Sequence, residues 1–181
     1  MGLYSRNKGK RGERMWASFC REQGYDVHRT AQYRGNTGAA GDVEGLPYIH
    51  CEVKYVQALN IAKAMEQSAR DAEASGTEDI PIVASKRTKE DWLVTMLARD
   101  WLRMISLVED IDHVHTVFAN EKKFSIRKKL DDVIQSYGPH ELIALCYDKH
   151  AYRLVTTYAE DWFTIYREWE AGMDLRRRAE R

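Results

Sequence analysis

Residues 49–55 restrict the fold of this chain most strongly, because apolar and polar side chains alternate along them. The odd-numbered positions are apolar and would point to one side of a strand, whereas His50, Glu52 and Lys54 would point to the other. A carboxylate and an ammonium would then share one face, with Cβ atoms about 7 Å apart. Asp42, ten residues before Glu52, would bring a second carboxylate. Two carboxylates can hold a hard cation, and an adjacent lysine can orient water or offset phosphate charge.

The composition is typical of a folded protein of one domain, or of two small halves that share a core. The chain has 181 residues, of which 44% are hydrophobic, and these include ten Tyr and five Trp. Its three cysteines lack C-x-x-C spacing and lie in apolar contexts, so we expect buried, reduced thiols in a cytoplasmic protein. No apolar run is long enough to cross a membrane, and the charged N-terminus is not typical of a signal peptide.

The formal net charge is zero, but cations are concentrated at both ends of the chain. We expect residues 1–9 to form a flexible basic arm and residues 173–181 to form a basic tail. Such segments either contact phosphate groups or keep a protein soluble. Charge alone leaves both interpretations open.

The order of predicted elements indicates an α/β fold, in which helices flank a mixed central sheet. Gly24 would end the first helix, and Asn60 would cap the second. The first part of the chain follows the order helix, strand, strand, strand, helix, strand, strand, helix. The helices are expected over residues 10–23, 61–74 and 98–108, and the strands include residues 25–30, 49–55, 80–85 and 92–96.

The rest of the chain repeats part of this order at an offset of 61 residues. Residues 82–101 and 143–162 share seven identities in twenty positions, among them the pair Trp101 and Trp162. The matches fall on predicted strand and helix positions. We therefore expect a duplicated strand-helix-hairpin-helix half, and a repeat of this kind concerns architecture rather than chemistry.

The second copy contains another E-x-K triplet, formed by Glu121 and Lys123. A strand over residues 114–119 precedes it, and a helix signal starts immediately after Lys123. No Gly-rich loop precedes this triplet, unlike the first one. We therefore expect one intact site in a core of residues 10–108, followed by a degenerate copy over residues 109–172.

Two residues on predicted helices are candidates to join the intact site. Glu13 lies one turn before Trp16, so its carboxylate either faces inward or stabilises the helix dipole. Gln67 forms a polar row with Lys63 and Arg70. That row either faces water or reaches the site, where Gln67 would be an orienting residue.

The arrangement of Glu13, Asp42, Glu52 and Lys54 around a small mixed sheet resembles the PD-(D/E)xK nuclease superfamily. It is most similar to the Holliday-junction-resolvase-like endonucleases of phages and archaea. The resemblance covers residues 8–105 and implies a restriction-endonuclease-like core. The chain departs from the family in having a glycine where the family has a proline before the aspartate, and the duplicated half is not part of the minimal fold.

The resemblance implies hydrolysis of phosphodiester bonds with Mg²⁺ or Mn²⁺ as the cofactor. Asp42 and Glu52 would bind the metal together with the carbonyl of Val53, and Glu13 would assist directly or through water. Lys54 would position or help deprotonate the attacking water and offset charge on the phosphate. The expected partner is DNA, including four-way junctions, and a homodimer in a phage or bacterial cytoplasm is the expected form. The candidate phosphate contacts are Arg6, Lys8, Lys10, Arg11 and Arg34.

Two other classes of function remain compatible with the sequence. A nuclease-fold protein without activity would bind DNA or a partner, and salt-sensitive binding without cleavage would favour it. An interaction module would instead use the Trp-rich and Tyr-rich second half, and it would not bind nucleic acid at low salt. The alternative interpretation of Glu52 and Lys54 themselves is a surface ion pair on an exposed strand.

Overall fold

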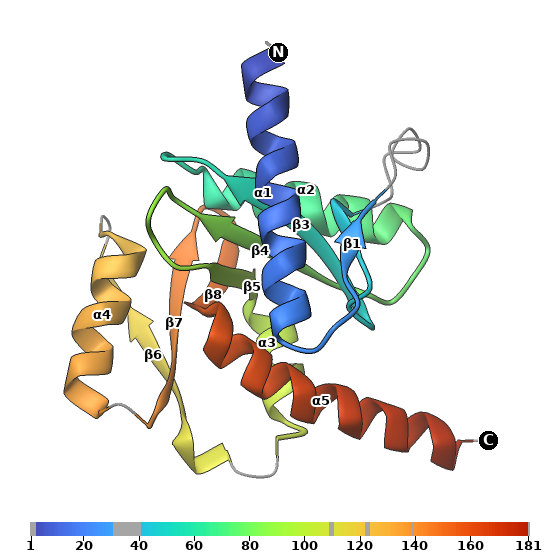
Figure 1. Cartoon of the computed structure of the whole chain (residues 1–181). Coiled ribbons are helices and arrows are strands. Elements are labelled where there is room, and N and C mark those ends of the chain that lie inside the picture. The colour runs from blue at the N-terminus through green and yellow to red at the C-terminus, as the bar shows by residue number, and fades with distance from the viewer. Residues whose placement is uncertain (1–2, 31–40, 109–110, 122–123, 139, 181) are drawn as a thin grey trace. The chain divides into compact units, whose positions relative to one another are not determined.

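The computed structural model describes residues 3–30, 41–108, 111–121, 124–138 and 140–180, and it shows mixed sheets with helices on their faces (Figure 1). The chain divides into two compact units, Met1–Thr95 and Met96–Arg181. The division falls inside strand β5 (Leu93–Leu97), so the boundary expected at residue 108 lies within the second unit. Within the described ranges, no helix is long and apolar enough to cross a membrane.

The predicted order of helices and strands is confirmed in both units. The first unit contains α1 (Leu3–Glu22), β1 (His28–Arg29), β2 (Val43–Glu44), β3 (Ile49–Tyr55), α2 (Ile61–Ala74) and β4 (Ile80–Lys86), and β5 follows. The second contains α3 (Ala98–Ile105), η2 (Ile111–His113), β6 (Val114–Ala119), α4 (Ile126–Tyr137), β7 (Leu142–Lys149), β8 (Tyr152–Tyr158) and α5 (Ala159–Ala179).

The main differences from expectation lie near the ends of the chain. Helix α1 begins at Leu3, so the segment expected to be a flexible arm is helical from that residue. Helix α5 continues to Ala179, so the expected basic tail is the end of a helix. Lys and Arg have good intrinsic helix propensity, so a basic segment can continue a helix as readily as it can form an arm. Strand β1 has only two residues, and α3 ends at Ile105 rather than at Val108.

In the first unit the strand order is β1-β2-β3-β4, with β5 beside β4. Strand β2 is antiparallel to both β1 and β3, whereas β3 is parallel to β4 over all seven of its residues. Helix α2 is the crossover between these parallel strands and lies behind them in Figure 1, whereas α1 lies in front. Both faces of β3 are therefore covered, as is usual for parallel strands.

The two faces of β3 contact different helices. Tyr55 lies against α1, where a Cβ on Gly12 would come within 2.5 Å of the Cβ of Tyr55. Lys54 points the other way and donates a hydrogen bond to Gln67 on α2. The predicted alternation is therefore confirmed, and the even-numbered side chains of β3 face α2.

The core of the first unit forms between α1 and the sheet. Trp16 is fully buried, and its ring lies 5.1 Å from that of Trp92. All three cysteines of the chain are buried and free of disulfide bonds, as expected. The predicted cap is also confirmed, because the Asn60 side chain accepts from the N–H of Lys63 at 3.2 Å.

In the second unit the strand order is β8-β7-β6, with β6 parallel to β7 and β8 antiparallel to β7. Helix α4 is the crossover from β6 to β7. It lies on the face that carries His115, whose ring centroid is 4.6 Å from that of Tyr137. The opposite face carries Thr116, which accepts a hydrogen bond from the indole of Trp101 on α3.

The structure repeats a short strand-to-helix element but does not confirm the wider duplication. Strands β5 and β8 each lead directly into a helix, with Leu97 and Tyr158 as extended caps at ψ 140° and 145°. The residues before this element do not match in the same way. Ile82 pairs with Cys51, on the β3 face that contacts α1, whereas Ile143 pairs with His115, on the β6 face that contacts crossover helix α4. Side chains of successive strand residues point to opposite faces, so Ile82 and Ile143 are not equivalent, although the strand-to-helix element keeps the offset of 61.

Candidate active site

Asp42 lies immediately before β2 and beside the middle of β3. Its N–H donates to the carbonyl of Cys51 at 2.9 Å, and its Oδ2 accepts from the N–H of Val53 at 2.8 Å. Gly41 permits this close approach, since a Cβ there would lie 2.9 Å from the Cys51 carbonyl oxygen. The antiparallel pairing of β2 with β3 thus brings the Asp42 carboxylate to the segment that carries Glu52.

Glu52 is buried in spite of its charge, with a relative exposure of 5%. The ammonium of Lys54 forms an ion pair with its Oε1, and the same ammonium donates to Oε1 of Gln67 at 3.4 Å. A buried carboxylate is costly unless a cation or hydrogen bonds compensate it. The pairing expected for Glu52 and Lys54 is present, but it is not the exposed-strand pair that the alternative interpretation required.

Glu13 has its side chain largely covered on α1, and it is held by a residue that the sequence analysis did not identify. The Nε of Arg29, on β1, donates to Oε2 of Glu13, and the two side chains have exposures of 27% and 15%. The residues are 16 positions apart, and no motif spacing connects them. The pairing of β1 with β2 places Arg29 opposite Val43, the residue that follows Asp42.

The three carboxylates interact electrostatically around Asp42. Burial, and after it the negative charges of Glu52 and Glu13, raise the pKa of Asp42 from 3.8 to about 7. The N–H of Val53 and the charge of Lys54 oppose this shift without cancelling it. Asp42 is therefore the carboxylate whose ionisation most needs an added positive charge.

The donor set is compatible with a hard divalent cation. Asp42 and Glu52 offer carboxylate oxygens, which Mg²⁺ and Mn²⁺ prefer, and a cation there would relieve the repulsion that raises the pKa of Asp42. Among the described residues, no three His, Cys, Asp or Glu side chains are gathered closely enough to hold a metal by themselves. The residues thus fit a metal that also takes oxygen ligands from water or phosphate, as Mg²⁺ commonly does.

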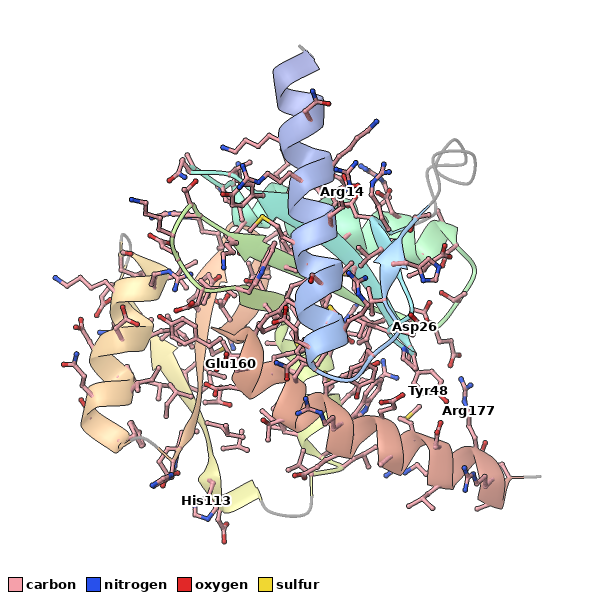
Figure 2. All side chains as sticks on the ribbon, viewed as in Figure 1. Arg14, Asp26, Tyr48, His113, Glu160 and Arg177 are labelled. Atoms are coloured by element: carbon pink, nitrogen blue, oxygen red, sulfur yellow. The ribbon has the colours of Figure 1, made fainter. Side chains whose placement is uncertain are left out.

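The basic residues expected to contact phosphate have different surroundings. Lys8 lies over the Tyr55 ring, with its Nζ 5.5 Å from the ring centroid, at the end of β3 that follows Lys54. Lys10 is half-buried and Arg11 is exposed on α1, and Arg14 is a further exposed cation on this helix (Figure 2). The side chain of Arg6 and the whole of Arg34 lie outside the described residues.

The second E-x-K triplet does not occupy a corresponding strand position. Strand β6 ends at Ala119, so Glu121 follows the strand instead of lying within it. Its carboxylate is exposed and accepts from Lys129 of α4 at 2.6 Å. Lys123 lies outside the described residues.

Comparisons with known proteins give one structural similarity. No protein-family model matches the chain, and no curated protein matches it. Among solved structures, the chain is similar to Hjc, a Holliday junction resolvase from the archaeal hyperthermophile Archaeoglobus fulgidus, with 25% sequence identity and a TM-score of 0.36. The similarity covers 48% of this chain and 70% of that one.

Proposed function

We propose that this protein is a metal-dependent endonuclease that hydrolyses phosphodiester bonds in DNA, with branched DNA such as four-way junctions as the preferred substrate. The observation that carries the proposal is the position of Asp42 beside β3, where a carboxylate with a raised pKa lies next to the ion pair of the buried Glu52 with the part-buried Lys54. Perturbed ionisable groups gathered on adjacent strands are typical of catalytic sites. The glutamate and lysine come from a single strand, so their spacing is fixed by the backbone.

In this mechanism Asp42 and Glu52 would hold Mg²⁺ or Mn²⁺, and the Val53 carbonyl would help to hold it. Bound there, the metal supplies Lewis-acid stabilisation of the phosphate and lowers the pKa of a bound water. The Lys54 ammonium offsets negative charge on the phosphate and orients the attacking water, and Gln67 keeps this ammonium in place. Glu13 acts through water, because Arg29 already occupies one of its oxygens.

The DNA backbone contacts Lys8, Lys10 and Arg11 along α1, together with Arg6 and Arg34. Contacts of this kind position the substrate without reading its sequence. Paired cuts across a junction require two sites, and we infer that a homodimer supplies them. The strand-to-helix repeat belongs to the scaffold, and the proposed site lies in the first unit.

The direct test measures cleavage of plasmid DNA and of a four-way junction in Mg²⁺ or Mn²⁺. We expect Asp42→Asn and Glu52→Gln each to lower the cleavage rate by about 10³-fold or more, because each removes a metal-binding charge. Glu73→Gln, at an exposed position of α2, is the matched control and should cut at the wild-type rate.

Three outcomes would contradict the proposal in different ways. Cleavage at the wild-type rate by both site variants would show that the site is elsewhere. Salt-sensitive DNA binding by the wild type without cleavage in any divalent ion would indicate a binding protein on a nuclease fold. Failure to bind DNA at low salt would favour an interaction module.

A further inference from the structure

The turn between β4 and β5, residues 87–92, lies at the end of β3 that carries Lys54. Strands β3 and β4 are parallel, and their register places Lys86 opposite Tyr55. The pairing continues one residue further, because the N–H of Val56 donates to the carbonyl of Lys86 at 3.2 Å. The turn that follows Lys86 therefore begins beside the segment that follows Lys54.

Hydrogen bonds anchor this turn to the end of β3. The Oγ1 of Thr88 accepts from the hydroxyl of Tyr55 at 3.3 Å and from the Nε2 of Gln57 at 2.7 Å. The N–H of Glu90 donates to the carbonyl of Arg87 at 3.2 Å, which closes a β-turn. The turn thus has a defined position relative to the candidate active site, although it contributes no residue to that site.

Two cations of the turn are presented to solvent. The side chain of Arg87 is 52% exposed, and Lys89 is exposed as well. Lys89 has a φ of 65°, a left-handed conformation that is uncommon for residues other than glycine. Over the described ranges, no hydrogen bond or ion pair engages its ammonium. Backbone conformations of this kind are often found at binding sites.

Two further lysines flank the same end of β3 on the side of α1. The Nζ of Lys8 lies 5.5 Å from the ring centroid of Tyr55, and the Nζ of Lys86 lies 5.7 Å from that of Trp92. The parallel register places Lys86 on the face of the sheet that Tyr55 occupies, and Trp92 contacts Trp16 of α1. An ammonium held over a ring keeps its charge, and it has less conformational freedom to lose when it binds an anion.

We propose that the β4–β5 turn is a second phosphate-binding element, in which Arg87 and Lys89 contact the DNA backbone next to the phosphate at Lys54. The inference rests on the proposed function for its partner, DNA, and it adds a surface that the family resemblance does not imply. Residues 86–91 include three cations and two acids. One of the acids, Glu90, lies 4.0 Å from Arg87, and a surface pair at this distance contributes little. The turn therefore acts through the position of its cations rather than through a large net charge.

A chain of phosphates explains this arrangement better than a single anion does. Lys8 approaches the end of β3 from α1, and Arg87 and Lys89 approach it from the turn after β4. A DNA strand that passes Tyr55 would meet cations from both elements, one phosphate after another. Such contacts hold the substrate equally well in the ground state and the transition state, so they should lower KM and leave kcat unchanged.

Fluorescence anisotropy with a labelled four-way junction, in buffer without divalent ions, provides the test. The turn variant combines Arg87→Gln with Lys89→Asn, which removes both charges, and asparagine adopts the left-handed conformation more readily than most residues. The dissociation constant should rise about tenfold at physiological salt, and the slope of log affinity against log salt should fall by about 1.8, twice the value for one phosphate contact. In the cleavage assay, KM should rise by a similar factor, and kcat should stay within about twofold of the wild type.

The matched control combines Lys128→Gln with Lys149→Gln, which removes two exposed positive charges from the second unit and should bind as the wild type does. Thr88→Val tests the anchor, because it removes the oxygen to which Tyr55 and Gln57 donate and keeps both cations of the turn. It should weaken DNA binding by about threefold in the wild type. In the turn variant it should have no effect, because the anchor acts only through the charges that it positions.

The outcomes separate this proposal from the proposed nuclease activity. If the wild type binds DNA without cutting it and the turn variant binds weakly, the turn proposal stands and the nuclease proposal fails. If the wild type cuts DNA and the turn variant loses no more affinity than the control, the turn proposal alone is overturned. A wild type that binds no DNA at low salt would overturn both.

Discussion

The two units each contain a parallel strand-helix-strand motif, and the first strands of these motifs differ sharply in what they place under the crossover helix. In β3 the side chains on the α2 side are His50, Glu52 and Lys54, and the first two of them are buried. In β6 the side chains on the α4 side are those of His115, Val117 and Ala119. One strand therefore buries a carboxylate under its crossover helix, whereas the other places a histidine, a half-buried valine and a buried alanine there.

This difference shows that β3, unlike β6, carries the desolvation cost of a buried carboxylate. Taking a carboxylate out of water costs several kcal/mol unless it is compensated, and an apolar residue at the same depth would be cheaper. Val117 and Ala119 show that a strand under a crossover helix can fold without charges. The charges on β3 are therefore better explained by chemistry than by the needs of the fold.

Among the tests of this contrast between the strands, the largest expected effect comes from removing the ammonium on β3. Lys54→Met should lower the cleavage rate by about 10²–10³-fold, because the charge that balances the phosphate is lost while the stem of the side chain is kept. Val117→Met introduces the same residue on β6, and it should leave the nicking rate within about twofold of the wild type. The measurement is the initial rate of plasmid nicking. If both variants lose this rate to a similar extent, the proposed difference between the two strands is wrong.

A smaller effect concerns the free energy of unfolding, and it distinguishes Asp42 in the first unit from Asp161 in the second. In metal-free buffer at pH 8, Asp42→Asn should stabilise the protein by about 2 kcal/mol, because it removes a buried charge near Glu52 and Glu13. Added Mn²⁺ should stabilise the wild type and have little effect on the variant. Chemical denaturation with and without the metal measures both effects.

The pH dependence follows from the direction of the shift. The pKa of Asp42 rises from 3.8 to about 7 on folding, so the folded state binds the proton more tightly. The contribution of the protonated Asp42 to the free energy of unfolding is therefore complete below about pH 4, and it is lost as the pH rises through about 7. Burial also raises the pKa of Asp161, to about 6, but Asp161 accepts a hydrogen bond from the backbone of Ile143 and lies far along the chain from the site. Asp161→Asn should thus alter the pH dependence without altering the response to Mn²⁺.

The sequence predicted the parts of the site that depend on a single segment. The alternation along residues 49–55 placed Glu52 and Lys54 on one face, and the cap at Asn60 set the start of α2. It could not reveal the Arg29–Glu13 pair, which depends on how β1 packs beside α1 and has no sequence spacing of its own. The structure repeats the strand-to-helix part of the predicted duplication and does not confirm the rest, since side chains in strands have a period of two and Ile82 and Ile143 fall on different faces.

The smallest expected effect tests whether α1 contributes to DNA binding beside β3. Lys8 is held over the Tyr55 ring, so its charge lies near the end of the strand that carries Lys54. Losing one phosphate contact should weaken binding by about threefold to fivefold and reduce the slope of log affinity against log salt by about 0.9. Lys8→Ala should show both changes in fluorescence anisotropy titrations at several salt concentrations. Lys128→Ala, at an exposed position of α4 in the other unit, should show neither, because the proposed phosphate contacts lie along α1. If the two variants lose affinity equally, the binding surface extends over both units, and the contrast between the strands applies to cleavage alone.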